Sequence, residues 1–209
     1  MKKIKAVIFD MDGVLIDAKE WHFDALNMAL STFGFEITRT EHLSKYDGLP
    51  TKKKVDMLNK DKGFPIELLD FINDLKQKFT SQIIATECKP VFTHQYALSK
   101  LQKEGYKLSV ASNSVRKSVQ TMLDVSAIID FFDFYMSNED VKQPKPNPEM
   151  YIKSIDKHGL KPEEVLILED NHHGKQAAIS SGAHLLEIDT IFDVNFKNIT
   201  DRIREIENA

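Results

Sequence analysis

Two aspartates separated by one residue stand in the segment FDMDGVLID, residues 9–17. The apolar residues before them, in KIKAVIFD at 3–10, predict a buried strand. Asp10 and Asp12 therefore fall where parallel sheets bind ligands, and Gly13 allows a sharp turn after them. Two carboxylates at such a place need a cation or a shared proton. Taken alone, the pair is equally compatible with solvated acids at a strand end.

Two further segments carry groups suited to a phosphate. In KLSVASNS, residues 107–114, Ser112 and Asn113 follow a predicted strand and precede a predicted helix, where a hydroxyl and backbone N–H groups can bind an anion. In QPKPNP, residues 143–148, prolines fix the backbone around Lys145 and can direct its charge toward the sheet. Each feature by itself also fits an ordinary helix cap or a solvated loop lysine.

A second pair of carboxylates ends another apolar run. In VLILEDNHHG, residues 165–174, Glu169 and Asp170 close a predicted buried strand. Gathered with Asp10, they supply the hard oxygen ligands that Mg²⁺ prefers. The two histidines that follow are expected to be loop residues, because carboxylates dominate the group. The pattern therefore favours Mg²⁺ over a transition metal.

The segments that carry these groups belong to an alternating pattern of strands and helices. Alternation of this kind predicts parallel strands joined by helical crossovers, and hence an α/β fold. The carboxyl ends of such strands share one edge of the sheet, so the polar groups are expected to meet there. Strands are predicted at residues 3–10, 107–112, 131–137, 165–170 and 184–189, and helices at 91–104, 115–125, 148–158 and 174–181.

The stretch between the first two predicted strands has a different character. Residues 17–87 have helical apolar spacing throughout, broken at Gly34 and at residues 47–50 and 63–65. We predict an all-helical cap over 17–87, inserted into an α/β core formed by residues 1–16 and 88–209. The insertion explains a length of 209 residues, which exceeds one small domain and falls short of two average ones.

Composition excludes several classes of protein. The net charge is −4, and the densest basic run is only Lys52-Lys53-Lys54, so no nucleic-acid partner is expected. Cys88 is the single cysteine, which rules out an internal disulfide and favours a reducing compartment. No apolar run approaches the roughly 20 residues of a membrane span. We expect a cytoplasmic protein without a membrane partner, either a monomer or a weak homodimer.

In this order, the motifs FDMDG, ASNS, KPNP and ED resemble the haloacid dehalogenase superfamily. The resemblance covers essentially the whole chain. It is strongest to the phosphatase-like members with a helical cap after the first strand, the group of β-phosphoglucomutase and phosphoglycolate phosphatase. It implies a Rossmann-like parallel sheet with that cap. It also implies a Mg²⁺-dependent phosphatase for a small phosphorylated metabolite, a sugar phosphate being favoured, acting through an aspartyl-phosphate.

The resemblance also implies roles for individual residues. Asp10 would be the nucleophile, and Asp12 would protonate the leaving oxygen and then deprotonate the attacking water. Ser112 would bind the transferring phosphoryl group, whose charge Lys145 would balance beside Asp10. Such an arrangement is reasonable, because phosphoryl transfer depends mainly on positioning and charge neutralisation. The implied Mg²⁺ ligands are Asp10, the backbone carbonyl of Asp12, Asp170 and, directly or one layer behind, Glu169.

Within the superfamily, the second aspartate favours phosphoryl transfer over carbon–halogen cleavage, because only the former has a phosphate ester oxygen to protonate. The chain departs from its relatives at Asn171, where they commonly have serine. Substrate specificity is expected in the cap. The candidate substrate-binding residues are Asn113, His22, Thr51 and Lys52.

Two alternatives stay open. A phosphosugar mutase of the β-phosphoglucomutase type would use the same nucleophile but return the phosphoryl group to a sugar. A non-catalytic phosphoacceptor or binding module, such as a response-regulator receiver, also combines strand-end aspartates with a lysine. Receivers are little more than half this length and have no helical insertion, so we favour an enzyme.

Overall fold

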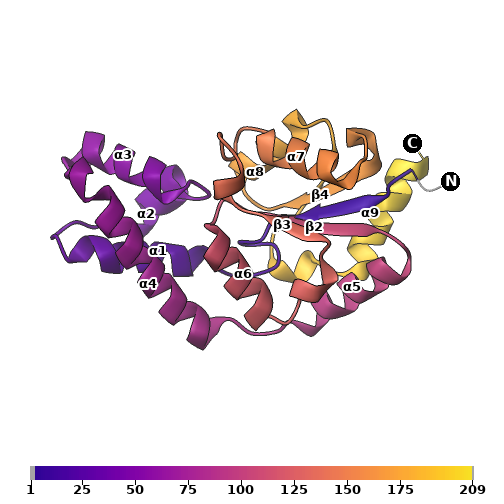
Figure 1. Cartoon of the computed structure of the whole chain (residues 1–209), viewed down its shortest axis with the longest axis horizontal. Helices are drawn as coiled ribbons and strands as arrows, with labels where there is room; N and C mark the ends of the chain where they lie inside the picture. Colours follow the sequence, from indigo (N-terminus) through magenta and orange to yellow (C-terminus); the bar gives the residue numbers. More distant parts are fainter. Residues whose placement is uncertain (1–2, 209) are drawn as a thin grey trace.

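The computed structural model describes residues 3–208. One sheet of five parallel strands has the order β3-β2-β1-β4-β5, so the first strand is central (Figure 1). This architecture confirms the predicted α/β fold class. The strands are β1 (Ala6–Phe9), β2 (Lys107–Ala111), β3 (Phe134–Met136), β4 (Val165–Glu169) and β5 (His184–Glu187).

Helices cover both faces of the sheet (Figure 1). Successive side chains of β1 point to opposite faces, and all of them are buried. Val7 and Phe9 pack in a cluster with α5, α6 and α9, whereas Ala6 and Ile8 pack in a second cluster with α7 and α8. The helices of the two faces are α5 (Phe92–Lys103), α6 (Arg116–Val125), α7 (Glu149–His158), α8 (His172–Ser180) and α9 (Phe196–Asn208).

Between β1 and α5, the chain folds into helices beside the sheet, at the left of Figure 1. We call α1 to α4 the helical segment; α1 packs along α4. It has its own apolar cluster, whose members all lie between Phe23 and Phe79. The helices are α1 (Lys19–Ser31), α2 (Arg39–Glu41), a π-helical turn (His42–Tyr46), α3 (Thr51–Lys62) and α4 (Leu69–Glu87).

Short 3₁₀ turns join several elements. One of them shortens a predicted strand: of residues 131–137, only Phe134–Met136 pair in the sheet, because Ile129–Phe131 close a turn just before them. None of the helices within residues 3–208 is long and apolar enough to span a membrane. The other 3₁₀ turns are Ile66–Leu68, Asn138–Asp140, Pro162–Glu164 and Ile191–Asp193.

The parallel topology brings distant segments to one edge of the sheet. Asp10 follows β1, Ser112 follows β2 and Asp170 follows β4, each without an intervening residue. Backbone hydrogen bonds continue past the strands: Asp10 donates to the carbonyl of Leu168 at 3.0 Å, and Ser112 donates to that of Met136 at 3.0 Å. The predicted functional side chains therefore start from positions fixed by the sheet.

Candidate active site

A buried lysine joins two carboxylates at the carboxyl edge of the sheet. The Nζ atom of Lys145 lies 2.6 Å from Oδ1 of Asp10 and 2.6 Å from Oε1 of Glu169, and it donates to the carbonyl of Ala111 at 2.8 Å. The lysine is only 3% exposed. Burial, followed by the charge of Glu169, raises the pKa of Asp10 well above its usual value, and Lys145 opposes that rise.

Asn113 holds the loop that carries Lys145. Its Oδ1 accepts a hydrogen bond from the backbone of Lys145 at 3.1 Å, and its Nδ2 donates to the carbonyl of Lys145 at 3.2 Å and to that of Gly48 at 2.9 Å. Asn113 lines the cavity, and both ends of its amide are hydrogen-bonded to the protein, so it positions the loop of Lys145. Its role as a substrate contact stays a prediction.

Glu169 is fixed from a second direction. The hydroxyl of Tyr151 donates to its Oε1, and both side chains are buried. Burial and the charge of Glu169 raise the pKa of Tyr151 well above its usual value, which keeps the hydroxyl protonated as a donor. Sequence reasoning missed Tyr151, because its pattern on the predicted helix is that of an ordinary core aromatic.

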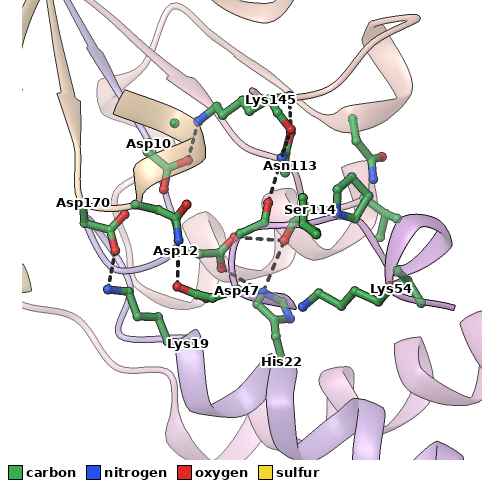
Figure 2. A pocket seen from close by; sticks show the side chains of 18 of the residues that line it. Asp10, Asp12, Lys19, His22, Asp47, Lys54, Asn113, Ser114, Lys145 and Asp170 are labelled. Carbon is green, nitrogen blue, oxygen red and sulfur yellow. Dashed lines mark hydrogen bonds and ion pairs between the residues drawn. The ribbon is translucent and has the colours of Figure 1, made fainter. Parts of the chain in front are cut away.

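Asp12 points away from Lys145 and toward the helical segment (Figure 2). Its Oδ1 lies 2.9 Å from Nε2 of His22, and its Oδ2 accepts hydrogen bonds from the hydroxyls of Ser112 at 3.1 Å and Ser114 at 2.9 Å. Burial alone raises the pKa of Asp12, but the His22 ring and the three hydrogen bonds outweigh it and lower the pKa to about 2.

The proton positions on His22 follow from its partners. Nζ of Lys76 lies 3.3 Å from Nδ1 of His22, and an ammonium group only donates, so Nδ1 accepts. Nε2 then carries the hydrogen and donates to Asp12. Burial, followed by the charge of Lys76, lowers the pKa of His22 below its usual value, which favours this neutral form. The histidine thus links Asp12 to the helical segment.

Three carboxylates gather beside this group. Oxygen atoms of Asp10, Glu169 and Asp170 all lie within 4.8 Å of one another. Within residues 3–208, Oε2 of Glu169 and both oxygens of Asp170 are buried without a hydrogen-bond partner, although Oδ2 of Asp170 is 2.5 Å from Nζ of Lys19 in an ion pair. Unsatisfied, hard oxygen donors fit a Mg²⁺ ion.

Gly13 makes room for this cluster. Its φ is +91°, and a Cβ atom there would lie 2.1 Å from Oδ2 of Asp170. Any side chain would therefore be strained and would displace the carboxylate. The turn after the first strand thus depends on glycine both for its backbone angle and for the close approach of Asp170.

Residues of the helical segment close the cavity over these groups. Asn171 Nδ2 donates to Oδ2 of Asp47 at 2.7 Å, while its Oδ1 caps α8 by accepting from the backbone of His173 at 2.9 Å. Asn171 therefore connects the sheet edge to a loop of the helical segment. From that segment, the cavity is lined by Lys19, His22, His42, residues 47–51, Lys54, Lys76 and Gln77.

The predicted cap residues have different positions. His22 and Thr51 line the cavity, whereas Lys52 is exposed and does not. Lys54 lines it instead, because residues 51 and 54 lie three apart on one face of α3. Ser112 is fully buried behind the cavity wall and touches Asp12, while Ser114 lines the cavity.

Comparison with known proteins identifies a family that this chain matches. The model of the haloacid dehalogenase-like hydrolases matches residues 7–188. The phosphorylated carbohydrates phosphatase of Thermotoga maritima is 27% identical over 187 residues, covering 86% of this chain and 82% of that protein. The pyrophosphatase PpaX of Bacillus velezensis is 27% identical over 181 residues, covering 87% and 81%.

The fold is also that of a solved structure. The crystal structure of β-phosphoglucomutase from Clostridium difficile matches with a TM-score of 0.83 at 22% sequence identity. The match covers 99% of this chain and 100% of that one. At this level of identity, the similarity establishes the shared architecture.

Proposed function

The chain belongs to the haloacid dehalogenase-like hydrolase family, and from that premise we propose that it is a Mg²⁺-dependent phosphatase. It would hydrolyse a small phosphorylated metabolite, a sugar phosphate being favoured, through an aspartyl-phosphate on Asp10. The observation that carries the proposal is the buried contact of Lys145 with both Asp10 and Glu169 at 2.6 Å, beside unsatisfied carboxylate oxygens. Such a site balances the charge of a phosphoryl group at a carboxylate nucleophile.

In the first step, the carboxylate of Asp10 attacks phosphorus and the bond from phosphorus to the leaving oxygen breaks. Lys145 balances charge at Asp10, and Asp12 gives its proton to the departing oxygen. The dianionic phosphoryl group beside Asp12 opposes the ionised carboxylate and so favours its protonation for this step. Asp10, Asp170 and the backbone carbonyl of Asp12, with Glu169 directly or one layer behind, would hold Mg²⁺, which would supply further positive charge at the phosphoryl oxygens.

In the second step, Asp12 accepts a proton from water as the water attacks the aspartyl-phosphate, and Asp10 is released. The ionised form that His22, Ser112 and Ser114 stabilise is the form that this step requires. We propose that residues 17–87 are a cap and that residues 1–16 and 88–209 are the catalytic core. The cap would exclude bulk water through the contact of Asn171 with Asp47.

We also propose a cytoplasmic location and a small-molecule partner. The single cysteine, Cys88, is buried and free, which suits the reducing cytoplasm. The partner is a small phosphorylated molecule, and the chain would work as a monomer or weak homodimer. Size-exclusion chromatography with light scattering tests the oligomeric state.

The proposed function is tested by incubating the purified protein and Mg²⁺ with a panel of phosphorylated metabolites and measuring released phosphate. Acid quenching with a substrate carrying ³²P in its phosphoryl group should leave label on the wild-type protein. Asp10→Asn should abolish both turnover and label. Asp17→Asn, at an exposed carboxylate outside the cavity, is the matched control and should retain both. Full turnover by Asp10→Asn would refute the nucleophile assignment.

A phosphosugar mutase is the second candidate, favoured by one observation. Asp10 is only 7% exposed and the helical segment covers the cavity, which limits the entry of water. Incubation with a hexose 1-phosphate and a trace of the hexose bisphosphate separates the two activities. If the isomeric hexose phosphate forms without release of free phosphate, the protein is a mutase and the phosphatase proposal is refuted.

A further inference from the structure

Among residues 3–208, four lysines line the cavity, and three of them have partners. Lys145 contacts two carboxylates, Lys19 contacts Asp170 and Lys76 contacts the ring of His22. These three cations are therefore accounted for by the protein itself. The fourth, Lys54, is different.

The side chain of Lys54 is buried without a counterion. Lys54 is 6% exposed, and within residues 3–208 its Nζ makes no hydrogen bond or ion pair. It lies next to Val55 on the inward face of α3, so the helix holds it in the cavity wall. Burial lowers its pKa to about 8, and the charges of Asp47 and Asp12 only partly oppose this. An ammonium on a side chain this buried has no counterion at contact distance, and an anion bound at Nζ in the cavity would supply one.

A second polar side chain beside Lys54 also lacks a partner. His42 is 2% exposed, lines the same cavity and has no hydrogen-bond partner on either ring nitrogen among residues 3–208. Its Nε2 lies 3.7 Å from Oδ1 of Asp47, too far for a hydrogen bond. Two unsatisfied groups in one wall, both more than nine-tenths buried, indicate a place where a polar part of a ligand is bound.

The position of Lys54 shows which part of a ligand it faces. Figure 2 shows its side chain extending toward Asp12 and His22, on the side away from Asp10 and Asp170. In the proposed reaction the phosphoryl group lies at Asp10, and Asp12 protonates the leaving oxygen. The remainder of the leaving group therefore extends past Asp12, toward Lys54.

We propose that Lys54 binds a second anionic group, a carboxylate or a second phosphate, on the leaving-group part of the substrate. The enzyme would then be selective for phosphate esters that carry two acidic groups. This inference rests on the proposed phosphatase function and names a substrate class for it. Lys54 is a specificity-determining residue in this proposal, not part of the phosphoryl-transfer machinery.

The test compares substrates that differ only in the second anion. Glycerol 3-phosphate and 3-phosphoglycerate have the same three-carbon frame. The first has a hydroxymethyl group at the carbon where the second has a carboxylate. Fructose 6-phosphate and fructose 1,6-bisphosphate provide the corresponding comparison for a second phosphate. We expect the wild type to have a kcat/KM about 10- to 100-fold higher for at least one of the doubly anionic members, the range expected for a charge-assisted hydrogen bond.

Variants then assign the selectivity to one side chain. Lys54→Met should reduce the preference to within about threefold, mainly through KM, and should leave the rate with the singly anionic member nearly unchanged. Lys54→Arg keeps the charge and should keep the preference. Lys53→Met, at the exposed neighbouring lysine, should match the wild type. Removal of an unpaired buried charge should not unfold the protein, which thermal unfolding of Lys54→Met checks.

Two results would overturn the role of Lys54. One is equal kcat/KM values within both substrate pairs for the wild type. The other is an equal fall in kcat/KM for the singly and the doubly anionic substrate in Lys54→Met. A preference carried by only one pair identifies the second anion as carboxylate or phosphate. Absence of phosphate release from any of the four esters and from para-nitrophenyl phosphate would instead refute the proposed phosphatase function.

Discussion

The ammonium nitrogen of Lys19 lies 2.5 Å from Oδ2 of Asp170, a carboxylate that we propose holds Mg²⁺. A lysine and a metal ion at the same carboxylate repel each other. The side chain of Lys19 is 34% exposed, so solvent screens part of that repulsion and gives the lysine room to move aside. The ion pair thus opposes metal binding without blocking it.

Lys19→Met is therefore expected to bind Mg²⁺ about fivefold more tightly than the wild type. Isothermal titration calorimetry on the protein without substrate measures this directly. Lys19→Arg, which keeps the positive charge, should bind Mg²⁺ with nearly the wild-type affinity. Weaker binding by Lys19→Met would mean that the lysine orients Asp170 for the metal.

The Lys145→Met variant should unfold more easily than the wild type. Lys145→Met leaves Asp10 and Glu169 buried close together without their shared cation, and we expect a loss of about 3 kcal/mol in the free energy of unfolding. Urea unfolding without added metal measures it. The double variant Lys145→Met/Glu169→Gln should recover most of the stability but none of the turnover. If the single variant were as stable as the wild type, the ion pairs would be energetically unimportant.

Gly174→Ala should destabilise the protein, although alanine normally favours a helix over glycine by about 1 kcal/mol. A Cβ atom at this position of α8 would lie 2.0 Å from Oε1 of Glu169. That carboxylate cannot move freely, because Lys145 and Tyr151 both hold it. We expect a loss of about 2 kcal/mol in thermal unfolding experiments and a parallel loss of turnover. Ser180→Ala, on the exposed face of the same helix, is the control.

Stability should fall as the pH is lowered from 7 to 5. His158 is buried, with Nε2 2.9 Å from the hydroxyl of Ser109, and burial lowers its pKa from 6.5 to about 4. Below pH 6.5 the unfolded chain takes up a proton on His158 that the folded protein does not. The free energy of unfolding is therefore at its full value above pH 6.5 and decreases as the pH falls toward 4. The contribution of His158 to the loss by pH 5 is about 2 kcal/mol.

The measurement is urea unfolding across that pH range for the wild type and His158→Gln. The variant should be less sensitive to pH, because it lacks one group that the unfolded state protonates. His172→Gln, at an exposed histidine, should follow the wild-type curve. Identical slopes for all three proteins would show that His158 is not held in its neutral form.

The sheet and its edge were predictable because their signals are local. The apolar runs of the strands are short and continuous, and parallel topology then requires that Asp10, Lys145 and Asp170 approach one another. The strand pattern also predicts that Ser112 follows β2. It does not predict the hydrogen bond of Ser112 to Asp12, because that contact depends on the χ angles of both side chains. The first residue of a strand is harder to predict where a turn immediately precedes the strand, as before Phe134.

The contribution of the helical segment was harder to predict, because it depends on which helix faces the sheet edge. Lys76 stands four residues after Ile72 and four before Thr80, on the buried face of α4. The signal in the sequence is a lysine at the four-residue spacing of Ile72, Thr80 and Ile84, which indicates a buried charge but does not identify its partner. Among three consecutive lysines, only the rotation of α3 distinguishes Lys54 from Lys52.

The apolar cluster of α1 to α4 draws on residues 23–79 alone. A substitution inside that cluster therefore disturbs packing locally and leaves the packing around the sheet intact, since distant sites contribute additively to stability. During evolution, lineages can remodel the surface that meets the leaving group while inheriting the phosphoryl chemistry unchanged. The separate apolar cluster within residues 23–79 makes divergence in substrate choice compatible with a constant reaction.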